Sequence, residues 1–346
     1  MENTLRIWFR KKIDLLCHNL EESILSDKTL KCKVVFGPVH SRRLGNVIGI
    51  NNIKQKACPY DCVYCTAGRT TCCSICTDYC LSPYQLHLSV RKKLEEIQNR
   101  DIKIDYIVFT GIGEPTLDLS LSKEILLLRE FGYKIAVFTN GSLLWRDDVR
   151  ENLMFADYVS VKIDTVNSET WMKMNRPHRK LDYELILKGI KQFSKCYRGK
   201  LTTETMLIKG INDSKMEIEN LSEYLNNLQR SVSYFMTPLY PPSEIYAVSP
   251  EREELNFIHK LIKEKIRNAV LLCCPEKQEF IATNDLENEL LGLLSLHPVS
   301  IEAVKSFTQN KDDSGILENL ITTGRIKQVS YNDKIYLVEN IVGSLN

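Results

Sequence analysis

The sequence lacks several features that would assign it to other classes of protein. No apolar run approaches the roughly 20 residues of a membrane-spanning helix, and the first residues show no charged-then-apolar signal pattern. There is no internal repeat and no low-complexity segment. The net charge of the 346 residues is only +2, which makes no overall case for a nucleic-acid partner. We therefore expect a cytoplasmic protein with one large domain, or a large and a small one.

Cysteine is plentiful but unevenly distributed. Seven of the 12 cysteines lie between Cys58 and Cys80, which fits reduced, metal-binding thiols better than a secreted disulfide scaffold. Three of them, Cys58, Cys62 and Cys65, fall within eight residues. Three thiolates can hold three irons of a [4Fe-4S] cluster and leave the fourth iron open to a ligand. Zinc, or an electron-transfer cluster with a fourth cysteine, fits the same spacing.

Strand-like and helix-like stretches alternate through the middle of the chain. Six stretches rich in Val, Ile, Tyr, Phe and Thr predict strands, and amphipathic helical patterns lie between them. This alternation predicts an α/β fold, a partial (β/α)6 barrel of parallel strands with its chemistry at their carboxyl ends. The predicted strands are residues 47–50, 104–110, 134–139, 158–164, 201–208 and 233–237.

Two segments flank the predicted barrel, which covers residues 36–270. Residues 1–35 carry a helical pattern and predict an N-terminal helical extension. In residues 285–346, three short helical patterns precede a hairpin that turns at Asn332-Asp333. Three helices and a hairpin predict a small winged-helix-like module.

Polar and glycine-rich motifs follow the predicted strands. The Gly-Ile-Gly-Glu-Pro turn at residues 111–115 lets a ligand approach the backbone closely, and Glu114 can accept a hydrogen bond from an ammonium group. Lys162 and Asp164 share one face at the end of the fourth strand, where a lysine among apolar residues indicates an anionic partner. An ordinary βα turn and a solvated edge lysine are the alternative interpretations.

Other strand ends and loops give weaker candidates. Asn140 lies in a Thr-Asn-Gly turn that would by default cap a helix. Glu204 and Met236 alternate toward the barrel mouth, although a methionine is more often part of a core. Polar loops at residues 41–45 and 175–178 could bind phosphate or carboxylate, or be solvated surface. The substrate contacts predicted in these loops are Arg42, Arg43, Arg176 and His178.

Taken in order, these motifs resemble the radical S-adenosylmethionine (SAM) superfamily. A CxxxCxxC motif follows the first predicted strand, GxGEP the second and Thr-Asn-Gly the third, so the resemblance covers about residues 36–270. The runs at residues 37–45, 68–70 and 175–178 resemble the branch of iron–sulfur oxidoreductases related to the wyosine and wybutosine synthases of tRNA. The resemblance implies a TIM-like barrel enzyme.

The resemblance also implies roles for individual residues. Cys58, Cys62 and Cys65 would hold a [4Fe-4S] cluster whose open iron binds SAM. An electron from an external ferredoxin- or flavodoxin-type donor would then yield a 5′-deoxyadenosyl radical that abstracts hydrogen from the substrate. Glu114 would accept from the methionyl amine and Lys162, which departs from the serine of the nearest relatives, would pair with the methionyl carboxylate. The other predicted cofactor contacts are Tyr64 against adenine, Ser160 and Asp164 near the ribose, and Gly111, Gly113, Asn140, Glu204 and Met236.

Four further cysteines depart from the pattern of close relatives, which usually carry polar residues there. They could ligate a second iron–sulfur cluster, supply a sulfur atom, hold zinc or remain spare thiols. We therefore treat an auxiliary metal site as a hypothesis. Its ligands would be Cys72, Cys73, Cys76 and Cys80.

Two substrate classes remain open. The wyosine resemblance favours a tRNA base, and residues 1–45 carry a net charge of +4, from nine basic and five acidic residues. Residues 285–346 carry −4, from five basic and nine acidic residues, unlike a winged helix that reads nucleic acid. A peptide or protein substrate is the alternative. A non-catalytic, redox-sensing iron–sulfur protein is disfavoured, because it has no use for Glu114, Lys162 and Asp164 around an open iron.

Overall fold

The computed structural model describes most of the chain. The predicted helical extension falls almost entirely outside the described residues, and the part of the chain from Val34 onward forms one compact unit. No helix in the described part is both long and apolar enough to cross a membrane. The described residues are 34–53, 56–100, 102–273, 286–294, 297–307 and 311–340.

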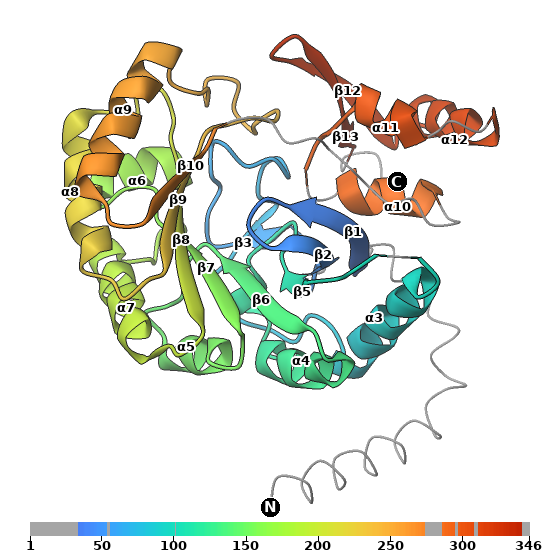
Figure 1. Cartoon of the computed structure of the whole chain (residues 1–346), viewed down its shortest axis with the longest axis horizontal. Helices are drawn as coiled ribbons and strands as arrows, with labels where there is room; N and C mark the ends of the chain where they lie inside the picture. Colours follow the sequence, from blue (N-terminus) through green and yellow to red (C-terminus); the bar gives the residue numbers. More distant parts are fainter. Residues whose placement is uncertain are drawn as a thin grey trace, which may run out of the picture. The chain divides into compact units, whose positions relative to one another are not determined.

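An eight-stranded sheet curves into a partial barrel (Figure 1). Its order is β1-β2-β5-β6-β7-β8-β9-β10; β1 is antiparallel to β2 and every later neighbouring pair is parallel. The predicted fold class and all six predicted strands are thereby confirmed. The bounds are β1 (Val35–Ser41), β2 (Gly45–Ile50), β5 (Tyr106–Phe109), β6 (Lys134–Thr139), β7 (Tyr158–Lys162), β8 (Lys200–Met206), β9 (Val232–Met236) and β10 (Ala269–Leu272).

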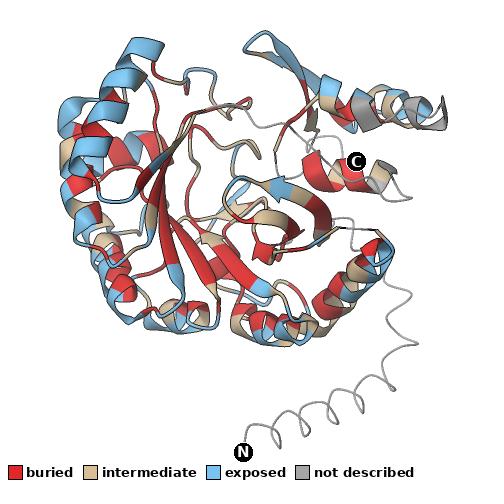
Figure 2. Ribbon diagram, in the orientation of Figure 1, coloured by how far each residue is buried: buried red, intermediate tan, exposed pale blue. Residues whose placement is uncertain are grey.

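Amphipathic helices cover the outer face of the sheet. In α7, Ile186, Ile190 and Phe193 are buried at helical spacing, whereas the outward surfaces of the helices are exposed (Figure 2). Burying each such side chain contributes about 1.5–3 kcal/mol. The helices are α3 (Pro83–Ile97), α4 (Leu121–Leu128), α5 (Asp147–Leu153), α6 (Ser168–Asn175), α7 (Tyr183–Cys196), α8 (Lys215–Asn226) and α9 (Arg252–Lys265), with short 3₁₀ turns at η1 (Pro115–Leu117) and η2 (Arg129–Phe131).

The inner face of the sheet carries a separate, smaller apolar cluster. This cluster contains Val47, Val108, Ala136 and Tyr158. The residues at the alternate positions of the strands, such as Ile48, point to the other face and pack with the outer helices. This alternation follows from the period of two along a strand. The barrel therefore has an apolar interior as well as an outer core.

The C-terminal module, residues 286–340, contains the three helices and the hairpin that the sequence predicts. Asn332 and Asp333 have φ values of 48° and 59°, which a two-residue type I′ hairpin turn requires. A further short strand adds to the hairpin in the order β11-β13-β12. Assignment to the winged-helix class stays a prediction. The elements are α10 (Leu286–Leu294), β11 (Val299–Ser300), α11 (Ile301–Phe307), α12 (Lys311–Thr322), β12 (Ile326–Tyr331) and β13 (Lys334–Glu339).

Candidate active site

The cysteine loop, residues 58–65, follows β2 and lies against the segment that ends α6. Main-chain N–H groups of Asp61 and Val63 donate to the carbonyls of Asn175 and Met174, both at 2.9 Å. The N–H of His178 donates to the carbonyl of Pro59 at 2.8 Å. The run at residues 175–178, predicted as a substrate loop, therefore supports the cysteine loop through its main chain.

Each of the three sulfurs accepts at least one hydrogen bond from an N–H donor. Such bonds stabilise negative charge on sulfur and adjust the potential of any cluster bound there. The donors are the Tyr60 N–H (3.4 Å) and Asn140 Nδ2 (3.3 Å) to Cys58, Asn175 Nδ2 (3.4 Å) to Cys62, and Lys56 Nζ (3.3 Å) to Cys65.

Burial keeps the thiols of Cys58 and Cys62 protonated while no metal is bound. It raises the pKa of Cys58 well above its usual value, with smaller contributions from Cys62 and Glu114. Burial also raises the pKa of Cys62 to about 12, with a further contribution from Asp164. Metal binding must therefore displace protons from this loop.

The donor set fits a cluster better than a single metal ion. Sulfurs bound to one zinc at about 2.3 Å in tetrahedral geometry lie within roughly 4 Å of one another. Among the described residues, no three His, Cys, Asp or Glu side chains are grouped to hold one ion. A cubane instead takes each thiolate on a different iron, so the three cysteines fit it without sharing an ion.

Glu114 joins the start of η1 to the end of β6. Its side chain is 2% exposed and accepts from the Thr116 N–H (3.2 Å) and hydroxyl (2.7 Å), the Thr139 hydroxyl (2.6 Å) and the Asn140 N–H (2.7 Å). Burial raises its pKa, although these donors oppose the shift. Its predicted contact with the methionyl amine stays a prediction, since both carboxylate oxygens already have internal donors.

Gly111 and Gly113 are required by the packing of the chain against itself. A Cβ at Gly113 would lie 2.2 Å from the carbonyl oxygen of Ala57, and one at Gly111 would lie 2.2 Å from Asn51 Oδ1. Ala57 directly precedes Cys58. Gly113 thus lets the GxGEP turn pack against the residue before the cysteine loop, and Gly111 lets it pack against the end of β2. The sequence did not indicate this role.

Lys162 and Asp164 meet at the cysteine loop, as their alternation predicts. The Tyr64 hydroxyl donates to Asp164, and Asn175 Nδ2 donates to the same oxygen at 2.8 Å. The Lys162 ammonium lies 4.8 Å from the centroid of the Tyr64 ring, a cation–π distance. Lys162, Asp164 and Asn140 line a cavity of about 10 Å³, which has room for one water molecule.

Glu204 of β8, which is level with Lys162 in the sheet register, pairs with Arg43. It also accepts from the Ser160 hydroxyl at 2.6 Å, and the Arg43 guanidinium lies 4.4 Å from the Phe138 ring centroid. Burial alone would raise the pKa of Glu204, but Arg43 and Lys162 lower it below its usual value. Arg43, predicted as a substrate contact, thus forms an ion pair with Glu204 of β8 in this structure. Its substrate role stays a prediction.

The remaining predicted contacts lie around the rim. Arg42 Nη1 donates to the carbonyl of Leu272 at the end of β10 (3.3 Å), and Met236 ends β9. Arg176 donates to Glu244 at 2.6 Å and to the Tyr246 hydroxyl at 2.8 Å. His178 is half-buried. Their substrate roles stay predictions.

The four additional cysteines lie beside the loop. Cys72 and Cys73 form β4 (Cys72–Cys73), which pairs with β3 (Ala57–Cys58); Cys72, Cys73 and Cys76 are exposed. Nothing in the described part of the chain supports an auxiliary metal at these cysteines, and that site stays a hypothesis.

Sequence reasoning missed two donors to the cluster thiols. Lys56 is 3% exposed and lies two residues before Cys58; Asn175 is also 3% exposed. The position of Lys56 next to the motif was a usable signal. Nothing in spacing links Asn175 to Cys62.

Comparison with known proteins identifies the class. The sequence pattern of the radical SAM superfamily matches residues 52–221. A solved radical SAM methyltransferase from Sphaerobacter thermophilus is 18% identical, with 66% of this chain and 67% of that chain aligned at a TM-score of 0.54, and so shares the fold. The chain belongs to the radical SAM superfamily, whose members are enzymes that use a [4Fe-4S] cluster and SAM.

More particularly, the chain is similar to the UPF0026 proteins. The UPF0026 protein of Methanocaldococcus jannaschii is 39% identical over 311 residues, covering 89% of this chain and 96% of that protein. A probable dual-specificity RNA methyltransferase of Endomicrobium trichonymphae is 24% identical over 219 residues, 60% of each protein.

Proposed function

We propose that this radical SAM enzyme binds its cluster through Cys58, Cys62 and Cys65 and modifies an RNA base, with tRNA favoured. The observation that carries the proposal is one loop bearing three thiols, each with its own N–H donor. When bound, the cluster and SAM supply a 5′-deoxyadenosyl radical that takes a hydrogen atom from the substrate. The electron comes from an external ferredoxin- or flavodoxin-type donor.

The surrounding side chains orient the cofactor. Lys162 offers a positive charge to the methionyl carboxylate. Asp164 accepts from three internal donors, Tyr64, Asn175 and the Met206 N–H, and so keeps one of its roughly four acceptor positions for a ribose hydroxyl. The hydrogen bonds of Asp164 to Tyr64 and Asn175 hold its carboxylate in place. Tyr64 and Asn175 are also buried, and the cavity beside them has room for about one water molecule.

A basic segment beside the cysteine loop supports RNA as the substrate. Residues 173–180, Lys-Met-Asn-Arg-Pro-His-Arg-Lys, contain four Lys or Arg and no acidic residue. Lys173, Arg179 and Lys180 are exposed. Lys and Arg side chains grouped in this way bind phosphates. The similarity to an RNA methyltransferase agrees with this assignment.

A peptide or protein substrate is the second candidate. It is favoured by the net charge of −4 over residues 285–346, which suits a protein partner better than a polyanion.

The test is anaerobic reconstitution with iron and sulfide counts, followed by an assay for 5′-deoxyadenosine after chemical reduction. Wild-type protein is expected to hold about four irons and cleave SAM. Cys62→Ala should lose the cluster and cleavage, whereas the matched control Cys76→Ala should keep both. Cleavage that survives Cys62→Ala would contradict the ligand assignment. About eight irons would instead give the additional cysteines a cluster.

A further inference from the structure

A cavity of about 230 Å³ lies between the barrel and the C-terminal module. Val108 and Phe138 line it from β5 and β6, and Val108 belongs to the inner-face cluster. Leu293 and His297 line it from the module. The cavity therefore uses the interior of the barrel for one wall and the module for another.

The cavity also reaches the proposed cluster site. Thr66, which directly follows Cys65, and Gly111, which opens the GxGEP turn, are among its lining residues. A group held in the cavity would thus lie beside the loop that carries the cluster cysteines. This is where a substrate must present its hydrogen atom.

The module is attached to the barrel near both ends of the sheet. On one side Phe36 of β1 belongs to the apolar core of the module, and Lys93 of α3 pairs with Glu289 of α10, both buried. Lys93 and Glu289 are 196 residues apart in the sequence.

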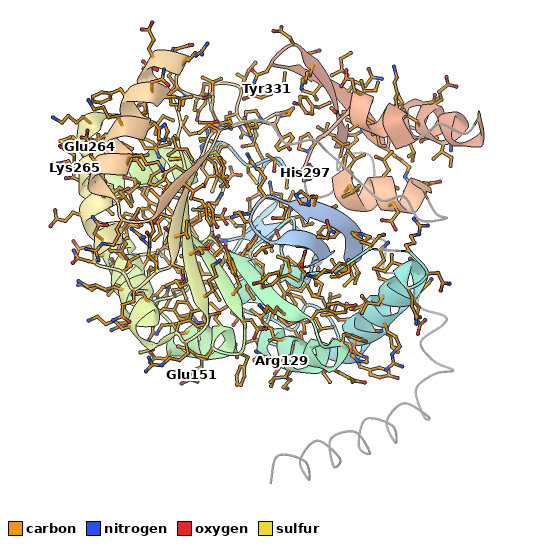
Figure 3. The ribbon with its side chains drawn as sticks, viewed as in Figure 1. Arg129, Glu151, Glu264, Lys265, His297 and Tyr331 are labelled. Carbon is orange, nitrogen blue, oxygen red and sulfur yellow. The ribbon has the colours of Figure 1, made fainter. Side chains whose placement is uncertain are left out.

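On the other side the module contacts the segment that follows β9. The Tyr331 hydroxyl donates to the carbonyl of Pro238 (3.3 Å), and that of Tyr336 donates to the carbonyl of Leu239 (3.4 Å). The ring of Tyr240 stacks on His297 with centroids 5.3 Å apart. Figure 3 shows His297 beside α10 and Tyr331 at the hairpin, on the two parts of the module that make these contacts. The module thus bridges the gap between the first and the late strands of the partial barrel.

The lining determines what the cavity can hold. It is mainly apolar, and among the described residues that line it there is no Asp, Glu, Lys or Arg. Hydroxyls of Ser41 and Thr110 and the ring of His297 supply a few polar contacts. Sites for drug-sized ligands occupy about 300–1,000 Å³, so this volume suits one ring system. An extruded nucleobase is such a group: it is uncharged, flat and apolar on both faces.

We propose that the C-terminal module forms the outer wall of the substrate site and that this cavity takes the base of the RNA substrate. The proposal rests on the function proposed above and goes further, because it assigns the module and the cavity to base recognition. The module then acts by closing the open side of the barrel. Its net negative charge does not prevent RNA binding, because the phosphates of the RNA would contact residues 173–180 instead.

The test fills the cavity from the barrel side. Val39, which pairs with Val47, lines the cavity, so Val39→Trp would occupy it. The control is His40→Phe on the same strand, where the side chain is exposed. Two probes are used: adenosine and guanosine, followed by saturation-transfer NMR, and bulk tRNA, followed by its stimulation of 5′-deoxyadenosine formation. Iron content and urea unfolding check that both variants fold.

We expect Val39→Trp to weaken both the nucleoside signal and the tRNA stimulation at least tenfold, and His40→Phe to change neither by more than twofold. If tRNA stimulates wild type and Val39→Trp equally, the cavity assignment is wrong and the proposed function stands. If nucleosides bind in a Val39-dependent way but tRNA has no effect, the cavity binds a nucleobase but RNA is not the substrate, and the proposed function is wrong. If neither probe acts, both proposals fail.

A cross-linking variant keeps the test valid if Val39→Trp does not fold. His297→p-benzoylphenylalanine should cross-link to a base of bound tRNA, whereas the same residue at Lys327, exposed on β12, should not. Equal cross-linking at the two positions, or none at position 297 while tRNA binds, would overturn the proposal.

Discussion

At the scale of single residues, Asn175 connects the proposed metal site to the cofactor site. Its Nδ2 group lies within 3.4 Å of Cys62 Sγ, 3.3 Å of the Tyr64 hydroxyl and 2.8 Å of Asp164 Oδ2. The two hydrogens of this NH₂ group are shared among three acceptors: a sulfur, a hydroxyl oxygen and a carboxylate oxygen. An amide suits this position because it donates without adding charge.

Asn175→Ala should destabilise the cluster-free protein by about 1–3 kcal/mol, because buried acceptors lose their donor. Urea unfolding measures the change. The control is Asn227→Ala: Asn227 is exposed and donates to the Glu223 carbonyl at 3.0 Å, so its loss should cost no more than about 0.5 kcal/mol. Equal effects would show that the network around Asn175 contributes no stability.

At the scale of elements, α10 and α3 hold the module against the barrel through Lys93 and Glu289. The two side chains are 7% and 10% exposed, so they are largely desolvated. Removing one partner of such a pair leaves a charge buried without its counter-ion, which is costlier than replacing both.

Lys93→Met should therefore destabilise the protein by about 3–5 kcal/mol, and Lys93→Met with Glu289→Leu should recover most of that loss. Urea unfolding of the two variants measures this, with Lys92→Met, one residue away and exposed, as the control. A double variant as unstable as the single one would mean that the charge pair is not the important contact.

The sequence predicts elements well where one periodicity continues for several residues. The six predicted strands and the amphipathic patterns of α3, α4, α7, α8 and α9 were confirmed for this reason. β1 was missed because Gly37-Pro38 and a register shift interrupt its pattern, and β10 was missed as well. The short helices α5 and α6 have few buried apolar residues and were also missed.

The candidate site was predictable only in its local part. The spacing of Cys58, Cys62 and Cys65 is contained in one loop, so a sequence motif can express it. The donor from Asn175 and the pairing of Arg43 with Glu204 join residues more than 100 positions apart. Such contacts depend on how the strands associate, which no local pattern records.

At the scale of the whole molecule, charge is nearly balanced. A net charge of +2 gives little long-range attraction to a polyanion, so RNA binding must depend on a local group of cations. Residues 173–180 are such a group, and they lie against the cysteine loop.

Replacing Arg179 and Lys180 together by alanine should weaken tRNA binding. The negative slope of log K against log salt should become shallower by about 2, one for each lost phosphate contact. Filter binding over a range of salt concentrations measures the slope. Replacing Lys260 and Lys263 of α9, which are equally exposed, should leave it unchanged. A slope that becomes shallower by the same amount in both variants would indicate non-specific attraction.

The main-chain contact between Asp61 and Asn175 has a consequence for biosynthesis. The two residues are 175 − 61 = 114 positions apart, so the cysteine loop leaves the ribosome well before its supporting segment exists. At about 5–20 residues per second, that interval is roughly 6–23 s. During it the cysteine loop lacks the hydrogen bonds that Asn175 and Met174 later make to its main chain. The loop can therefore reach its folded conformation only after residue 178 has been added, and a cluster at the proposed site would be assembled after that point.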